Sequence, residues 1–154
     1  DCGKALSPKN QWPKHHGHET KGLPAIKAMC KRLKVPKAYQ DLALLVCEYH
    51  THIHLLFELK SSTILKVIEA FDSFRKPERF EQYLLAGEAD SRGRTGYEDK
   101  EVPEISVFKQ CLAAAQTITA KPFVEQSLQG PKIAEAMRQQ RVKVIDKVMK
   151  AYKA

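Results

Sequence analysis

The stretch PKAYQDLALLVCEYHTHIH, residues 36–54, decides the fold class. Its apolar residues recur three and four positions apart, which is the spacing that places them on one face of an α-helix. Proline is favoured in the first turn of a helix, so this helix is predicted to begin near Pro36. The spacing extends to the histidines at its end through Leu42, Leu45, Val46 and Tyr49.

The same helical spacing continues along the rest of the chain. Further helices are predicted over residues 26–33, 61–71, 77–89, 105–115, 122–128 and 131–152. Ser61 and Ser62 are N-cap candidates, because a serine side chain accepts a hydrogen bond from the first turn. Glycines, a proline and many charges predict a loop over residues 91–104. No alternating strand pattern is present, so the predicted class is all-α, with residues 24–90 as the core and residues 131–154 as a helix lying on it or extending away.

Composition and charge narrow the class of protein. The longest apolar run falls well short of the ~20 residues that a membrane-spanning helix needs, so no membrane partner is expected. The four cysteines are widely spaced without a CxxC pair, which favours reduced core residues in a soluble, cytoplasmic protein. The net charge of +8 makes nucleic acid the leading partner class, since lysine and arginine attract phosphates. A merely solvated basic surface is the alternative.

The six histidines fall into two clusters, residues 15–18 and residues 50–54. His50 and His54 lie four positions apart, so one helix face could present both to a single metal ion. Metal sites of phosphohydrolases usually mix imidazole with carboxylate, which draws attention to Asp1 and Asp90. The alternative is that the first cluster is a solvated turn.

Two basic segments could contact a nucleic-acid backbone. Arg92 and Arg94 flank Gly93 and could grip phosphate, or they could pair with the carboxylates around them. The C-terminal helix is basic, and Arg138, Arg141 and Lys143 are its candidate RNA contacts. Its apolar stripe, which would dock on the body, comprises Ile145, Val148, Met149 and Tyr152.

The sequence contains five distinctive segments in this order: DCGKALSP from residue 1, WPKHHGHETKG from residue 12, KRLKVP from residue 31, FDSFRKPERFEQ from residue 71 and EADSRGRTGYE from residue 88. In this order they resemble segments of bacterial CCA-adding enzymes, the tRNA nucleotidyltransferases that carry an HD domain. The chain resembles the C-terminal half of these enzymes, so we expect it to be a piece of a longer protein. The resemblance implies an HD-domain portion over residues 1–98, with a helical-bundle fold, and a C-terminal helical extension over residues 99–154.

The resemblance also implies a metal site. In HD domains, His and Asp ligands hold a divalent ion that lowers the pKa of a bound water. Asp1 matches the aspartate of the His-Asp motif, and His18 matches the histidine of a Gly-His-Glu segment. His50 matches a histidine that an aspartate follows in several relatives, whereas Thr51 follows it here. Asp1, His18 and His50 are therefore the expected metal ligands.

Other residues have implied roles around that site. Asp90 is expected to complete or orient the catalytic group formed with the three ligands. Lys4 could contact phosphate as a point charge. The sequence leaves open whether His15 or His16 takes the place of His18, because the loop conformation decides it.

The resemblance implies two activities for the longer protein. CCA addition to tRNA uses ATP and CTP with Mg²⁺ on paired carboxylates of a nucleotidyltransferase sheet, and this sequence shows neither strands nor an Asp-x-Asp pair. The HD domain implies hydrolysis of phosphoesters, including 2′,3′-cyclic phosphodiesters, with Ni²⁺ or another transition metal. We expect such hydrolysis from the intact protein and little from this chain alone. The alternative is a non-catalytic helical body that supports tRNA for the nucleotidyltransferase head.

Overall fold

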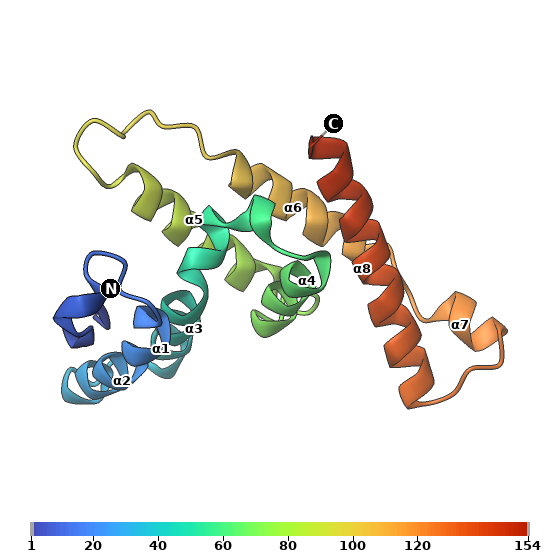
Figure 1. Ribbon diagram of the computed structural model, residues 1–154. Helices are drawn as coiled ribbons and strands as arrows, with labels where there is room; N and C mark the ends of the chain where they lie inside the picture. Colours follow the sequence, from blue (N-terminus) through green and yellow to red (C-terminus); the bar gives the residue numbers. More distant parts are fainter. Residues whose placement is uncertain (1, 154) are drawn as a thin grey trace.

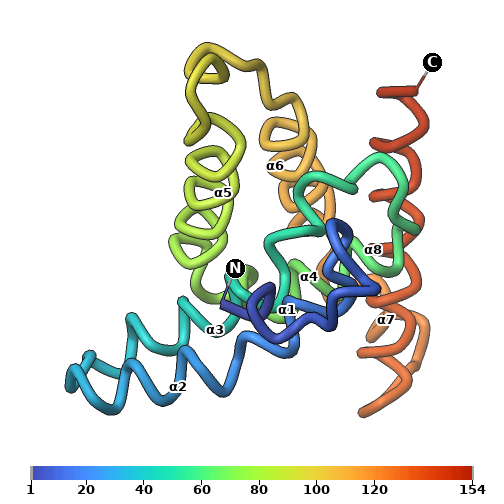
Figure 2. Tube along the Cα trace, turned by 60° about the vertical axis from the view of Figure 1, so that its left-hand side comes forward, coloured from blue at the N-terminus to red at the C-terminus, as the bar shows by residue number. Residues whose placement is uncertain are grey.

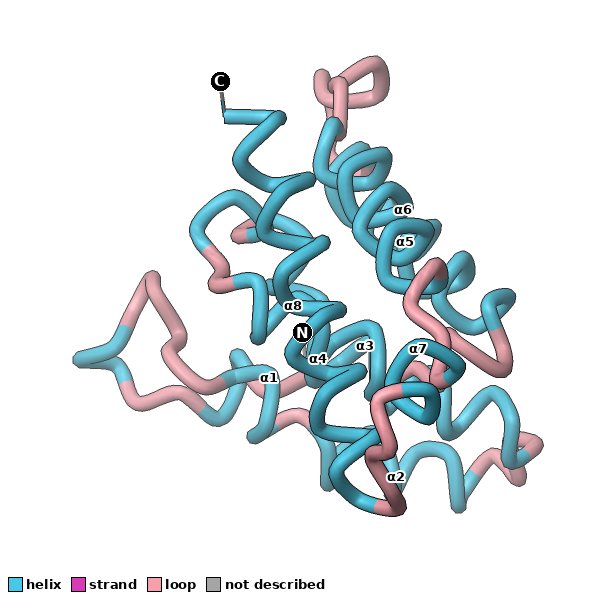
Figure 3. Tube along the Cα trace, turned by 90° about the vertical axis from the view of Figure 1, so that its right-hand side faces the viewer, coloured by secondary structure: helices cyan, strands magenta, loops and turns pink. Residues whose placement is uncertain are grey.

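The computed structural model describes residues 2–153, and Figure 3 shows that they form helices joined by loops, without a strand. The all-α prediction is confirmed. Three short 3₁₀ helices occupy residues 4–6, 9–11 and 56–58. The α-helices are α1 (His18–Lys21), α2 (Leu23–Arg32), α3 (Lys37–His54), α4 (Ser61–Ala70), α5 (Pro77–Arg92), α6 (Pro103–Gln116), α7 (Lys121–Glu125) and α8 (Pro131–Lys153).

Two helix ends differ from the prediction. The N-cap of α4 is Lys60, which makes no side-chain cap, so the assignment of Ser61 or Ser62 as the cap was wrong. Ser61 instead lies inside the helix, and its hydroxyl donates to Asp146 of α8 across 3.4 Å. The second difference is at the end of α5. This helix extends past its predicted end to Arg92, so the following loop is shortened to residues 93–102.

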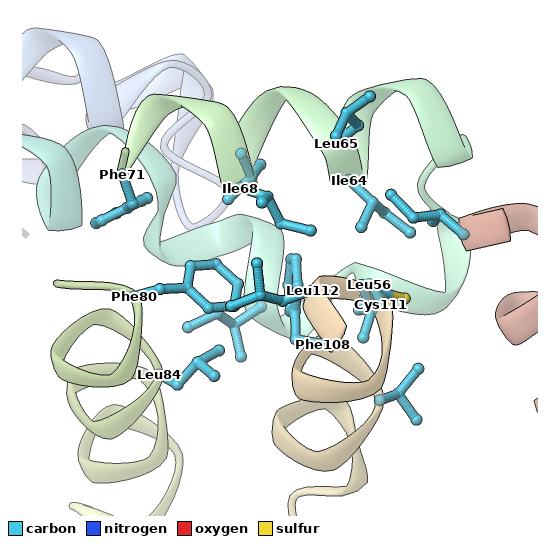
Figure 4. Close-up of a cluster of buried hydrophobic side chains, with 14 of the residues drawn as sticks. Leu56, Ile64, Leu65, Ile68, Phe71, Phe80, Leu84, Phe108, Cys111 and Leu112 are labelled. Atoms are coloured by element: carbon cyan, nitrogen blue, oxygen red, sulfur yellow. The ribbon is translucent and has the colours of Figure 1, made fainter. Parts of the chain in front are cut away.

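One hydrophobic core joins the end of α3 to α4, α5, α6 and α8, and Figure 4 shows part of it. Phe71 of α4's C-terminal end stacks on Tyr83 with ring centroids 4.3 Å apart, and Phe80 meets Phe108 of α6 edge to face. Ile145 of α8 is fully buried in the same cluster. The core therefore reaches beyond residues 24–90, because α6 and α8 cover the face that the earlier helices leave open.

Helices α2 and α3 form a hairpin that projects from this core, as Figure 2 shows. A small separate cluster holds its two arms together around Ile26, Cys30 and Cys47. Three large apolar side chains stay exposed on the hairpin, namely Met29, Leu33 and Tyr39. None of the helices within residues 2–153 is long and apolar enough to cross a bilayer.

A close contact between α3 and α5 determines how their C-terminal ends meet. Gly87 of α5 lies directly against Ile53 of α3, where no Cβ would fit. Tyr83 donates its buried hydroxyl to the carbonyl oxygen of Tyr49 across 2.9 Å. These contacts bring the histidines at the end of α3 beside Asp90 at the end of α5.

Candidate functional site

A pocket of about 640 Å³ opens between the end of α3, the end of α5 and the N-terminal segment. Its lining residues are Lys4, His18, His50, Thr51, His54, Ala89, Asp90, Gly93 and Arg94. The structure thus brings His18, His50 and Asp90 together from three separate parts of the sequence. The remaining predicted ligand, Asp1, lies outside the described residues.

His18 and His50 face each other through their Nε2 atoms, which are 3.1 Å apart. On the far side of each ring, Nδ1 bonds a carbonyl oxygen, that of His15 at 3.0 Å for His18 and that of Cys47 at 2.8 Å for His50. A carbonyl oxygen only accepts, so each Nδ1 carries the hydrogen and each neutral ring presents a lone pair on Nε2. This is how histidines are oriented when they bind a metal.

Burial lowers the pKa of His50, and the neighbouring His18 lowers it further, although the carbonyl of Cys47 acts in the opposite direction. Desolvation disfavours the charged imidazolium in such a position. The neutral form is the one that binds metal ions, so the pocket favours the state that a ligand needs.

Two glycines place His18. Gly17 precedes it with a φ of 72°, a left-handed conformation that glycine adopts without strain, and α1 begins at the next residue. Gly3 packs directly on the backbone of His18, where a Cβ would also come within 2.7 Å of the Gly22 nitrogen. The thiol of Cys47 donates to the carbonyl oxygen of Glu19, which ties α1 to α3. The Gly3 contact was not anticipated from the sequence.

His54 and Asp90 form a second pair in the pocket lining. His54 Nε2 lies 2.8 Å from Asp90 Oδ2, and Ser91 is near the other ring nitrogen at 3.5 Å. Burial acts to raise the pKa of Asp90, but the hydrogen bond and charge of His54, with His50 and Arg94, lower it overall. The spacing from His50 had suggested that His54 could share a metal ion with it, but His54 was not among the residues expected from the family resemblance, and in the structure it pairs with Asp90.

The other histidines lie outside the pocket lining. His15 is half-buried with its ring 5.9 Å from that of Trp12, and His16 is exposed. His52 packs on Tyr49 with ring centroids 5.3 Å apart, and burial lowers its pKa. Of the first cluster, His18 alone reaches His50.

Arg92 and Arg94 have different surroundings. Arg92 pairs with Glu88 across 2.9 Å and donates to the carbonyl oxygen of Lys100 across 3.0 Å, so it holds the loop after α5. Arg94 lines the pocket and makes no ion pair with any residue in the range 2–153. Phosphate contact by Arg94 fits this position better than contact by Arg92.

The predicted RNA contacts of α8 are partly engaged with the body. Arg138 lies 3.6 Å from Glu69, and the guanidinium of Arg141 stacks 3.9 Å from the ring centroid of Phe74. Lys143 is exposed beside a groove between Lys60 and α8. RNA binding by these residues stays a prediction.

Within residues 2–153, no group of three or more His, Cys, Asp or Glu side chains is arranged to hold a metal ion. The described part of the pocket therefore offers two oriented imidazole nitrogens, a carboxylate paired with a third imidazole, and two cationic side chains. Such a set can bind an anion next to a metal ion.

Comparison with known proteins gives several relatives. The chain is 46% identical over 153 residues to the Multifunctional CCA protein of Pseudomonas fluorescens, and 43% identical over 152 residues to that of Alkalilimnicola ehrlichii. The protein of the same name from Nitrosococcus oceani is 46% identical over 145 residues. These matches cover 94% to 99% of this chain but only 36% to 37% of the relatives. No family model matches the chain, and no solved structure matches it significantly.

Proposed function

The chain is homologous over almost its whole length to part of the bacterial multifunctional CCA proteins, and we propose that it forms the HD-domain portion of such a protein. Its pocket would hydrolyse phosphoesters, including 2′,3′-cyclic phosphodiesters at RNA ends, with a divalent metal ion. The longer protein would add CCA to tRNA through a separate nucleotidyltransferase head that uses ATP, CTP and Mg²⁺. Both activities belong to tRNA processing, for which a cytoplasmic location is expected.

The observation that carries this proposal is the pair formed by His18 and His50. Two lone-pair nitrogens 3.1 Å apart repel unless they share a proton or a metal ion, and both rings are held in place by backbone carbonyls in the orientation that a metal ion needs. The donor set fits Ni²⁺ or another transition metal, since imidazole suits these ions better than Mg²⁺. Asp1 would supply a carboxylate ligand, as the family resemblance implies.

The other lining residues have roles around that pair. A bound divalent ion would polarise the phosphoryl group and lower the pKa of a coordinated water. Arg94 and Lys4 place positive charge where the phosphate oxygens would lie. Asp90 fixes the orientation of the His54 ring, so that His54 can hold a proton at the edge of the pocket. Thr51, which lines the pocket, offers a hydroxyl in place of the carboxylate that follows His50 in several relatives of this family.

The second candidate is a non-catalytic body that supports tRNA. The net charge of +8 supports it, because a basic helical surface attracts the phosphate backbone. One protein could have both roles, but only phosphoester hydrolysis requires the geometry of the pocket.

Metal titration of the 154-residue chain tests the proposal. Calorimetry with Ni²⁺ and Mn²⁺ should give one site in the wild-type chain and a more than 100-fold weaker affinity in His18→Ala and His50→Ala, since loss of even a supporting residue typically costs about 10–100-fold. His16→Ala, in the same loop but exposed, is the matched control and should bind normally. Equal affinity in all four proteins would reject the metal site. In a full-length multifunctional CCA protein, the His50→Ala change should abolish 2′,3′-cyclic AMP hydrolysis and preserve CCA addition.

A further inference from the structure

One segment near the start of the chain carries positive charge without any negative charge. Residues 21–40 contain six lysines and arginines and no aspartate or glutamate. They therefore contribute +6, whereas the whole chain has a net charge of +8. This segment comprises all of α2 and the first residues of α3.

We define the hairpin tip as residues 27–39, where α2 ends and α3 begins. Its cationic side chains are all exposed, and they are Lys27, Lys31, Arg32, Lys34 and Lys37. Within the described part of the chain, Lys37 alone among them forms an ion pair, with Asp41 of its own helix. The other four cations of the tip form no ion pair with any residue in the range 2–153.

The basic helix α8 differs in this respect. Arg138 pairs with Glu69, Lys150 pairs with Asp146, and Arg141 stacks on Phe74. Arg138 and Arg141 thus help to dock the helix on the body, whereas the pair of Lys150 with Asp146 lies within α8. The hairpin tip has no comparable docking role, because α2 contacts α3 through its opposite, apolar face.

Apolar and aromatic side chains lie among the cations of the tip. Tyr39 is 69% exposed, Leu33 is 60% exposed and Met29 is 42% exposed. Exposed aromatic rings beside lysines are typical of surfaces that contact nucleic acid, where the rings stack on bases or riboses and the cations contact phosphates. Burial in the core explains none of these three side chains.

We propose that the hairpin tip binds the sugar-phosphate backbone of RNA. Lys31, Arg32 and Lys34 would contact phosphates, and Tyr39 would pack on a ribose or base. Lys37 and His50 lie 13 positions apart on α3, which at 1.5 Å per residue places the tip about 20 Å from the pocket along one rigid helix. An RNA whose end lies in the pocket would thus have its adjoining backbone held at a fixed distance.

RNA fits this surface better than an anionic membrane does. A membrane-binding helix needs a broad apolar face, but the apolar face of α2 is already packed against α3. The exposed apolar residues are single side chains between charges, which suits contacts to separate nucleotides. The choice of tRNA as the RNA rests on the proposed function, whereas the basic tip itself does not.

Binding of fluorescently labelled tRNA tests the proposal with a matched pair of variants. Lys31→Glu with Lys34→Glu reverses two charges at the tip. Lys121→Glu with Lys132→Glu changes the net charge equally, at exposed residues near α7, on the far side of the molecule in Figures 1 and 2. The tip variant should lose at least tenfold in affinity at 100 mM salt, and its plot of log affinity against log salt should be less steep by about 2 units. The control variant should lose less than threefold.

Three further measurements separate the possible failures. Tyr39→Ala should weaken tRNA binding about three- to tenfold without changing the salt dependence. The tip variant should bind Ni²⁺ like the wild type, because Lys31 and Lys34 lie outside the pocket lining, so a failed metal site and a failed tip are distinguishable. Equal losses in the tip and control variants would overturn the proposal, as would a tip variant that loses binding to phosphatidylcholine–phosphatidylserine vesicles but keeps its affinity for tRNA.

Discussion

Gly87 of α5 lies so close to Ile53 of α3 that no side chain fits between the two helices. Ile53 is fully buried, and it stands between His50 and His54 in the sequence of α3. The same contact therefore packs the core and holds the ends of α3 and α5 at the distance that the pocket requires.

Replacing Gly87 with Ala should destabilise the protein by about 1–3 kcal/mol, because a methyl group must displace the buried Ile53. Urea unfolding followed by circular dichroism measures this loss. Leu85→Ala, at an exposed position of the same helix, is the control and should change stability by less than about 0.5 kcal/mol. A Gly87→Ala protein as stable as the wild type would mean that the two helices do not meet at this point.

The pairing of Asp90 with His54 predicts a dependence on pH. The pKa of Asp90 should lie below its ordinary value of 3.8, because burial acts to raise it but is outweighed by the hydrogen bond and charge of His54 together with His50 and Arg94. A depressed carboxyl pKa stabilises the fold at pH values above 3.8, and this contribution is lost as the pH falls through the folded-state pKa. Carbon-13 NMR of the Asp90 carboxyl group should show its pKa rising in His54→Ala and unchanged in His16→Ala.

Arg94 and Arg92 should differ in their effect on phosphate binding. Arg94→Gln should weaken the affinity for inorganic phosphate about tenfold, since a hydrogen bond to a charged group contributes roughly 1.5–3 kcal/mol. Arg92→Gln should leave that affinity unchanged, because Arg92 is engaged with Glu88 and the carbonyl of Lys100. Phosphorus-31 NMR titration measures both. If Arg92→Gln weakened phosphate binding and Arg94→Gln did not, Arg92 would be the residue that contacts phosphate.

Cys111 should make the fold sensitive to alkali. Burial raises the pKa of its thiol from 9.0 to about 12. A raised pKa means that the stabilising contribution is complete below pH 9 and falls as the pH rises towards 12, where the folded thiol also ionises. Between pH 7 and pH 10, the free energy of unfolding should fall by about 1–2 kcal/mol less in Cys111→Ala than in the wild type. In the native wild type at pH 8, a maleimide should label the exposed Cys2 and spare Cys111.

The helices could be predicted because their apolar residues repeat at helical spacing, as in α3, where the pattern from Leu42 to Tyr49 extends to His54 in the structure. The N-cap of α4 could not, because Ser61 bonds Asp146, a partner 85 residues away. The short α1 has too few residues for a spacing pattern, and it depends on Gly17 and on packing against α3.

Which residues line the site was easier to predict from the sequence than which of them pair with one another. Histidine spacing and family resemblance pointed to His18, His50 and Asp90, and these do line one pocket. That Asp90 pairs with His54 follows from the contact of α3 with α5, which no local pattern encodes. Likewise, Arg92 pairs with Glu88 because α5 continues one turn further than its apolar residues indicate.

The packing of Gly3 on the His18 backbone has a consequence for how the chain opens. Residues 3–22 contribute to neither of the two hydrophobic clusters and join the body through α1, Gly3 and the Cys47 thiol. This flap should unfold locally at a lower free energy than the core, as loosely attached segments do. An ion coordinated by both His18 and His50 would act as a cross-link that closes a loop of 32 residues. The ion would then stabilise the attachment of residues 3–22 to the body as well as take part in catalysis. Its removal would expose this flap to proteases while the helical core remained intact.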